Sequence, residues 1–195
     1  MKRALDIIHD EHRALAAVLS GLSAVVEGIH QGRYEPDFEL LDAMIAYVTE
    51  LPERVHHPKE DHYLFAALRK RCPDATSVLD GLQAQHREGP AKTLELLRAL
   101  KRFRIGGASE LPAFRKTVRS YVDDQWQHMS TEETKVLPLA SNLLTPRDWA
   151  GIDAAFGAND NPWDGPAGVY RQLFTRIVTL APAPIGVGDA GGPKH

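Results

Sequence analysis

The sequence predicts an all-α protein built on an up-down antiparallel four-helix bundle, with extra short helices on its C-terminal side. Three observations predict this fold. Apolar residues recur at alternating three- and four-residue steps through four long segments, as on the buried face of an amphipathic helix. No segment shows the polar and apolar alternation of a β-strand. The long segments are joined by short connections, which place consecutive helices side by side in opposite directions.

The first helix is predicted over residues 3 to 30. Its apolar face skips one step, and a histidine, His12, stands at that step. Gly32 follows the last apolar residue and is expected to end the helix. The residues of this face are Leu5, Ile8, Leu15, Leu19, Leu22, Val26 and Ile29.

The second helix is predicted to begin near Asp37, whose side chain can cap the free amides, and to stop at Cys72-Pro73. Pro52 and Pro58 fall inside this segment. Because proline lacks an amide donor, both are expected to kink or restart the helix.

The third and fourth helices are predicted over residues 74 to 104 and 109 to 144. Pro90 is expected to bend the third helix, and Gly106-Gly107 to close it. The fourth carries an apolar face that is interrupted by His128 and Glu132. The bundle is therefore assigned to residues 1 to 144.

Residues 145 to 182 are expected to form a helical extension that packs on the bundle or on a partner. "TPRDW" has the residues of a capping box, "NDNPWDGP" reads as a loop, and "VYRQLFTRIVTL" is amphipathic. Trp149 and Trp163 are candidates to anchor this extension. The Pro- and Gly-rich residues 183 to 195 are expected to be a disordered tail.

Composition excludes several classes of function. The 23 basic and 26 acidic residues give a net charge of −3, which argues against a nucleic-acid or anionic-membrane binder that depends on general charge attraction. The first residues are too charged for a signal peptide, and no apolar run approaches the length of a membrane span. Cys72 is the only cysteine, so no internal disulfide can form. A cytoplasmic protein, monomeric or homodimeric, is expected.

Each predicted bundle helix carries one histidine on its apolar face. A single histidine in such a position is more often a hydrogen-bonded core residue than a metal ligand. Four of them, one per helix, are hard to explain in that way, because every buried imidazole needs a partner. The four are His12, His56, His86 and His128.

Two carboxylates strengthen the case for a metal site. Glu60 follows His56 by four residues, and Glu132 follows His128 by four, so each pair shares one helix face. One such pair alone would indicate only a surface contact. An unpaired carboxylate in an apolar core is costly, and a bound cation removes that cost while using the imidazoles. The donor set of imidazole and carboxylate suits iron, manganese or zinc.

His57 and His9 are further candidates with open roles. A count of the candidate histidines leaves the second metal with one ligand too few. His57 lies close enough to Glu60 around the helix to supply that ligand. Alternatively, His57 is a partly exposed outer donor. His9 either ligates or supports a ligand from outside. The remaining histidines, His30, His62 and His195, are expected to be exposed.

These residues resemble the hemerythrin-like, HHE cation-binding family over residues 1 to about 144. The matching segments are "HDEHRAL", "HHPKEDHYLF", "LQAQHREG" and "QHMSTEETKVLPLA". The resemblance implies two iron ions in an oxo- or hydroxo-bridged non-haem site, with manganese or zinc as possible substitutes. It carries metal ligation onto His12, His56, His86 and His128, and bridging onto Glu60 and Glu132.

One departure from the family pattern bears on function. Respiratory members place two histidines four residues apart on the third helix, but Leu82 and Pro90 flank His86 here. Either His57 supplies the missing ligand or one metal keeps an extra open position.

The expected function is binding or sensing of dioxygen or a related small oxidant. A first alternative is an enzyme acting on peroxide or nitric oxide, with Glu133, His57 or His9 as acid/base group. A second is an iron-responsive storage or regulatory module.

Overall fold

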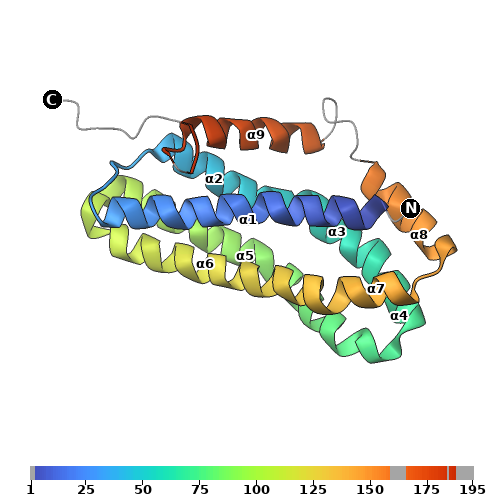
Figure 1. Ribbon diagram of the computed structural model, residues 1–195. Helices are drawn as coiled ribbons and strands as arrows, with labels where there is room; N and C mark the ends of the chain where they lie inside the picture. Colours follow the sequence, from blue (N-terminus) through green and yellow to red (C-terminus); the bar gives the residue numbers. More distant parts are fainter. Residues whose placement is uncertain (1–2, 159–165, 184, 188–195) are drawn as a thin grey trace.

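The computed structural model describes residues 3–158, 166–183 and 185–187, and it is all-α there, with four long helical arms in a bundle (Figure 1). The predicted all-α bundle is confirmed. The first arm is α1, Arg3–His30, as predicted. The second arm comprises α2 Phe38–Leu51, η1 Pro52–His56, α3 His57–Lys59, η2 Glu60–Phe65 and α4 Ala66–Arg71.

After a 3₁₀ turn, η3 Pro73–Ala75, the third arm is α5, Thr76–Gly106, which continues through Pro90. A second 3₁₀ turn, η4 Gly107–Ser109, leads to the fourth arm. That arm comprises α6 Leu111–Thr131, η5 Glu132–Val136 and α7 Leu137–Leu143. Around the bundle, α1 packs against α2 and α6, and α5 packs against the same two helices.

Local sequence signals place the ends of these arms. The Asp37 carboxylate accepts hydrogen bonds from the amides of Glu39 and Leu40 and so caps α2. Gly32 and Gly107 follow α1 and α5 with positive φ angles of 70° and 61°, a backbone conformation that glycine adopts without strain.

The second and fourth arms do not break at their prolines but widen into π-helical turns. The amide of His57 bonds the carbonyl of Pro52, and the amide of Leu137 bonds the carbonyl of Glu132, each five residues back. Pro58 and Pro138 come directly after these two amides. Proline has no amide to donate, and its ring would clash with the carbonyl four residues earlier in a regular helix. The wider turn accommodates the ring, and π-turns of this kind recur at functional sites.

Two further helices cover the bundle. Helix α8, Pro146–Gly157, begins with the predicted capping box between Thr145 and Asp148 and packs against α1. Helix α9, Pro166–Leu180, lies along α2, where Phe174 contacts Tyr47 (Figure 1). Trp149 is buried on α8, whereas Trp163 and most of the predicted disordered tail lie outside the described residues.

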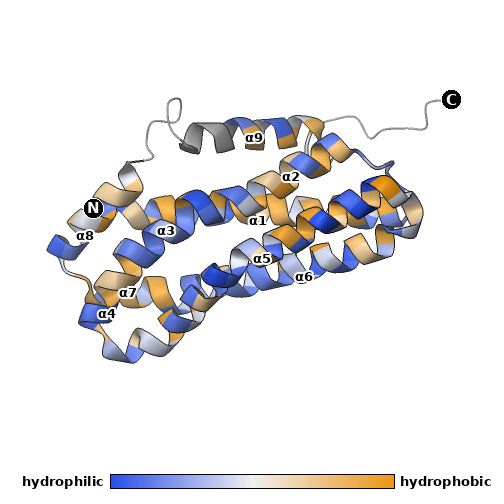
Figure 2. Cartoon of the chain, turned by 180° about the vertical axis from the view of Figure 1, so that it is seen from behind, coloured by the Kyte–Doolittle hydropathy of each residue, from blue (hydrophilic) through white to orange (hydrophobic). Residues whose placement is uncertain are grey.

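The core is divided into two apolar clusters, and the histidines lie between them. One cluster contains Leu15, Leu51 and Leu96, and the other contains Ile8 and Leu82. In Figure 2 each long helix carries both hydrophilic and hydrophobic residues along its length, as an amphipathic bundle requires. A polar layer across the middle of an apolar core is costly unless its groups are compensated, so this layer is the place to look for function.

Contrary to the sequence expectation that no apolar run approaches the length of a membrane span, helix α1 is long and apolar enough to cross a membrane by length and composition. However, 56% of its most apolar stretch is buried inside the protein, and the core helix of a bundle passes the same test.

Candidate metal centre

The structure brings one buried histidine from each arm into the polar layer, together with His57 and two glutamates. These side chains form overlapping groups whose candidate ligand atoms lie within 4.8 Å of one another. The first group is His12, His56, Glu60 and Glu132; the second is His86, His128, Glu60 and Glu132; the third is His57, His86 and His128. All seven sequence-predicted site residues are therefore found at one place, and Glu60 and Glu132 are common to both halves.

The four arm histidines face each other in two pairs through their Nε2 atoms. The His12 and His56 Nε2 atoms are 3.0 Å apart, and those of His86 and His128 are 3.2 Å apart. In a neutral imidazole one ring nitrogen carries a proton and the other a lone pair. Where Nδ1 donates to an acceptor, Nε2 presents its lone pair, so each close pair needs a proton or a cation between its nitrogens.

Each Nδ1 atom is indeed held by an acceptor from a neighbouring arm, so the four bonds form a closed ring around the bundle. Three acceptors are carboxylates and one is an amide. The pairs are His12 with Glu133 at 2.8 Å, His56 with Glu11 at 2.7 Å, His86 with Asp61 at 3.0 Å, and His128 with Gln85 at 2.8 Å. Such bonds fix the tautomer and aim Nε2 inward, as outer partners of metal-binding histidines do.

Glu60 and Glu132 each span both histidine pairs. The Glu60 oxygens are 3.3 Å from His56 Nε2 and 3.8 Å from His86 Nε2. The Glu132 oxygens are 3.3 Å from the Nε2 atoms of both His12 and His128. Both side chains are 0% exposed, and in the described part of the chain none of their four oxygens has a hydrogen-bond partner. Two carboxylates placed in this way could help to hold cations between the histidine pairs.

The electrostatics of the two glutamates show why they need compensation. Burial raises the pKa of Glu60, and the nearby charge of Glu132 raises it further. Burial also opposes the charge of Glu132, but His128 and His12 outweigh it and hold the pKa of Glu132 well below its usual range. Two like charges within 4.8 Å of each other in a buried site repel each other, and a bound cation would remove the repulsion.

His57 lies against the second histidine pair. Its ring stacks on that of His86, with centroids 4.0 Å apart, and its side chain is buried. Burial lowers the pKa of His57 well below its usual range, and the neighbouring imidazoles lower it further, so the ring is neutral as a metal ligand must be. The two halves of the site therefore differ, with two histidines in one and three in the other.

His9 lies outside these groups. It is 40% exposed and contacts Glu133, which also accepts from His12 Nδ1, so His9 supports the site from outside. His30 and His62 are exposed, as expected, and His195 lies outside the described residues.

The residues present fit a pair of divalent or trivalent cations. Inward-facing Nε2 atoms, partnerless buried carboxylates and fixed tautomers all suit metal binding, and a donor set of imidazole and carboxylate suits iron, manganese or zinc.

Three ring acceptors, Glu11, Asp61 and Gln85, were not singled out from the sequence. Each is the direct sequence neighbour of a predicted ligand, so a search for polar neighbours of ligands would have found them. Which histidine each one contacts depends on the packing of the arms and cannot be read from spacing.

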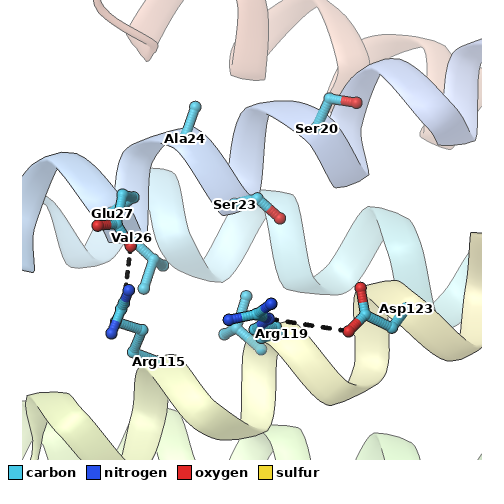
Figure 3. Close-up of a pocket in the computed structure, with 9 residues that line it drawn as sticks. Ser20, Ser23, Ala24, Val26, Glu27, Arg115, Arg119 and Asp123 are labelled. Carbon is cyan, nitrogen blue, oxygen red and sulfur yellow. Dashed lines mark hydrogen bonds and ion pairs between the residues drawn. The ribbon is translucent and has the colours of Figure 1, made fainter.

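A separate groove of about 480 Å³ lies between α1 and α6, away from the histidines (Figure 3). Its two arginines are both engaged with carboxylates, Arg115 with Glu27 at 2.7 Å and Arg119 with Asp123 at 3.9 Å. The possible metal-binding groups of the described residues lie in the histidine layer instead.

Comparison with known proteins agrees with this geometry. The family model described as Hemerythrin HHE cation binding domain matches residues 3–140, which include all the predicted ligands. No curated protein and no solved structure matches the chain. With a match over most of its length, and a His/Glu cluster that could bind metal, the chain belongs to the hemerythrin HHE cation-binding domain family.

Proposed function

We propose that this chain holds two iron ions in its histidine layer and binds or senses dioxygen or a related small oxidant there. The observation that carries the proposal is the pair of fully buried glutamates, Glu60 and Glu132, whose oxygens lack hydrogen-bond partners within the described residues and which lie between two histidine pairs. His12 and His56 would hold one ion, and His57, His86 and His128 the other.

When bound, iron supplies redox chemistry and an affinity for small oxygen-type ligands. The chain supplies the rest. The ring acceptors hold each imidazole in one tautomer and one orientation, and the two apolar clusters on either side keep bulk water away from the layer.

The geometry supports binding over turnover. Glu133 and His9, two of the three candidate acid/base groups, lie behind the His12 ring on its Nδ1 side, where Glu133 is already engaged. Neither faces the interior where a ligand would bind. Of the three candidates only His57 belongs to the inner groups, where it would serve as a metal ligand.

The test is metal analysis with absorption spectra of protein from iron-replete cells. We expect about two irons per chain and an ultraviolet charge-transfer band in the oxidised state, with a change in absorption when dioxygen reaches the anaerobic ferrous protein. Zinc or manganese in place of iron would overturn the metal assignment. A silent ferrous protein would overturn dioxygen binding.

A further inference from the structure

His57 differs from the four arm histidines in what holds its ring. Each arm histidine is bonded through Nδ1 to an acceptor at 2.7 to 3.0 Å. The Nδ1 atom of His57 is also buried, but it has no hydrogen-bond partner among the residues that the structure describes. A buried polar group left unpaired is costly, so this nitrogen needs a partner of its own.

A carboxylate lies beside this nitrogen. Glu53 stands about one helical turn before His57 on the same arm, in η1, and its Oε1 atom is 3.9 Å from His57 Nδ1. A separation about 1 Å shorter is an ordinary N–H···O hydrogen bond. Residues four apart in a helix share one face, so a small rotation of the Glu53 side chain closes the gap.

A glycine on the facing arm makes room for this carboxylate. Gly89 is buried within α5, and a Cβ atom at its position would overlap the Glu53 carboxylate, whose Cδ would be only 2.8 Å away. Glycine inside a helix is destabilising relative to alanine. The packing of the two arms therefore places Glu53 against α5 and next to His57 at some expense in helix stability.

We propose that Glu53 is the positioning residue of His57, that it accepts a hydrogen bond from His57 Nδ1, and that Gly89 keeps the place of its carboxylate open. With the proton on Nδ1, the Nε2 atom carries the lone pair that a metal ion needs. Glu53 then decides whether the second metal position has three histidines or two. This inference rests on the proposed function, since it concerns how the histidine layer holds its cations.

The test is a zinc titration against a competing chelator that resolves two binding steps, with nitrogen-15 NMR of the imidazoles in the zinc-loaded protein. Glu53→Ala should weaken one step by about 10- to 100-fold, leave the other unchanged and abolish the slow exchange of the His57 Nδ1 proton. Glu53→Gln keeps an acceptor oxygen, as Gln85 does for His128, and should restore both readouts. Glu50→Ala, at a surface ion pair on the same arm, is the matched control.

Further variants test the part played by Gly89. The methyl group of Gly89→Ala displaces only the end of a flexible side chain, so the helix keeps its fold. The open space beside Glu53 is the groove of about 490 Å³ between α2 and α5, so the carboxylate moves into it and away from the buried His57. Zinc binding should then weaken as in Glu53→Ala, and adding Gly89→Ala to Glu53→Ala should weaken it no further. Gly81→Ala, at an open position of the same helix, is the control.

The possible failures point to different parts of the proposal. If Glu53→Ala binds both zinc ions as the unmodified protein does, or if Glu53→Gln is as weak as Glu53→Ala, then Glu53 does not position His57. Additive losses from Glu53→Ala and Gly89→Ala overturn the role of Gly89. Unmodified protein that binds fewer than two zinc ions overturns the cation pair on which the proposed function rests, whatever the variants do.

Discussion

Replacing Glu11 by leucine tests whether the outer ring of acceptors controls metal binding. Glu11 accepts a 2.7 Å hydrogen bond from His56 Nδ1 and is only 17% exposed. Although burial opposes its charge, the bond to His56 lowers the pKa of Glu11, so it is a carboxylate at neutral pH. The leucine side chain keeps similar bulk but accepts no hydrogen bond, so it frees the His56 ring to change tautomer and orientation.

The size of the effect follows from this one bond. A hydrogen bond to a charged group contributes about 1.5–3 kcal/mol. Each 1.4 kcal/mol is a factor of ten in affinity, and loss of an outer partner of a metal ligand commonly costs 10- to 100-fold. We therefore expect Glu11→Leu to weaken binding of one metal by roughly 10- to 100-fold, with a smaller effect on the other. The second metal would be held chiefly from the opposite half of the layer.

The assay is a competition titration against a chelator that resolves two binding steps, with circular dichroism to check helix content. Glu95→Leu is the matched control, since Glu95 is exposed on α5. If Glu11→Leu binds both metals within threefold of the unmodified protein, the ring does not act on the metals. If both steps weaken equally, the two halves are not separate sites.

Three further predictions concern stability. Removing the metal with a chelator should lower the denaturation midpoint, because it leaves the buried carboxylates uncompensated; equal midpoints for loaded and stripped protein would contradict the proposed role of the cation. Tyr121→Phe should cost about 1–3 kcal/mol in urea unfolding, because the buried Tyr121 hydroxyl donates a 2.8 Å bond to the Val48 carbonyl, and a loss below about 0.5 kcal/mol would count against it. Hydrogen bonds from Arg71 and Thr145 to the Asp148 carboxylate hold its pKa far below the usual value of about 3.9. The carboxylate therefore stabilises the folded state above about pH 3.9, and this contribution to stability is lost as the pH falls below that value. Thermal unfolding from pH 6 to pH 2 should show a smaller acid loss in Asp148→Asn, and parallel curves would refute the assignment.

The fold was predictable because its signals are local and repeated. Periodic apolar faces, the Asp37 cap and the capping box at Thr145 each act within one or two turns of chain, and each is found where the sequence predicts it. The π-turns were not predictable in the same way. Pro58 signals that the helix must adjust, but whether it kinks, restarts or widens depends on how the rest of the arm packs.

That the site residues lie close together was also predictable, but how they pair with one another was not. Spacing places His56 and Glu60 on one face of one arm, and the bundle topology brings the four faces together. The division into two Nε2 pairs and the burial of His57 against His86 are properties of the packed arms. These features depend on how each arm is rotated about its own axis relative to its neighbours. The sequence pattern does not fix that rotation closely enough to predict them.

The single amide in the ring limits the negative charge around the site. In the described residues at least six carboxylates surround the layer, against four positive charges from two divalent ions or six from two trivalent ions. They are Glu60, Glu132, Glu11, Asp61, Glu133 and Glu53, whose carboxylate lies 3.9 Å from His57 Nδ1. A further carboxylate at Gln85 would enlarge the excess of negative charge over two divalent ions, and an excess charge beside a buried site is costly. Gln85 keeps the orienting bond to His128 without adding that charge.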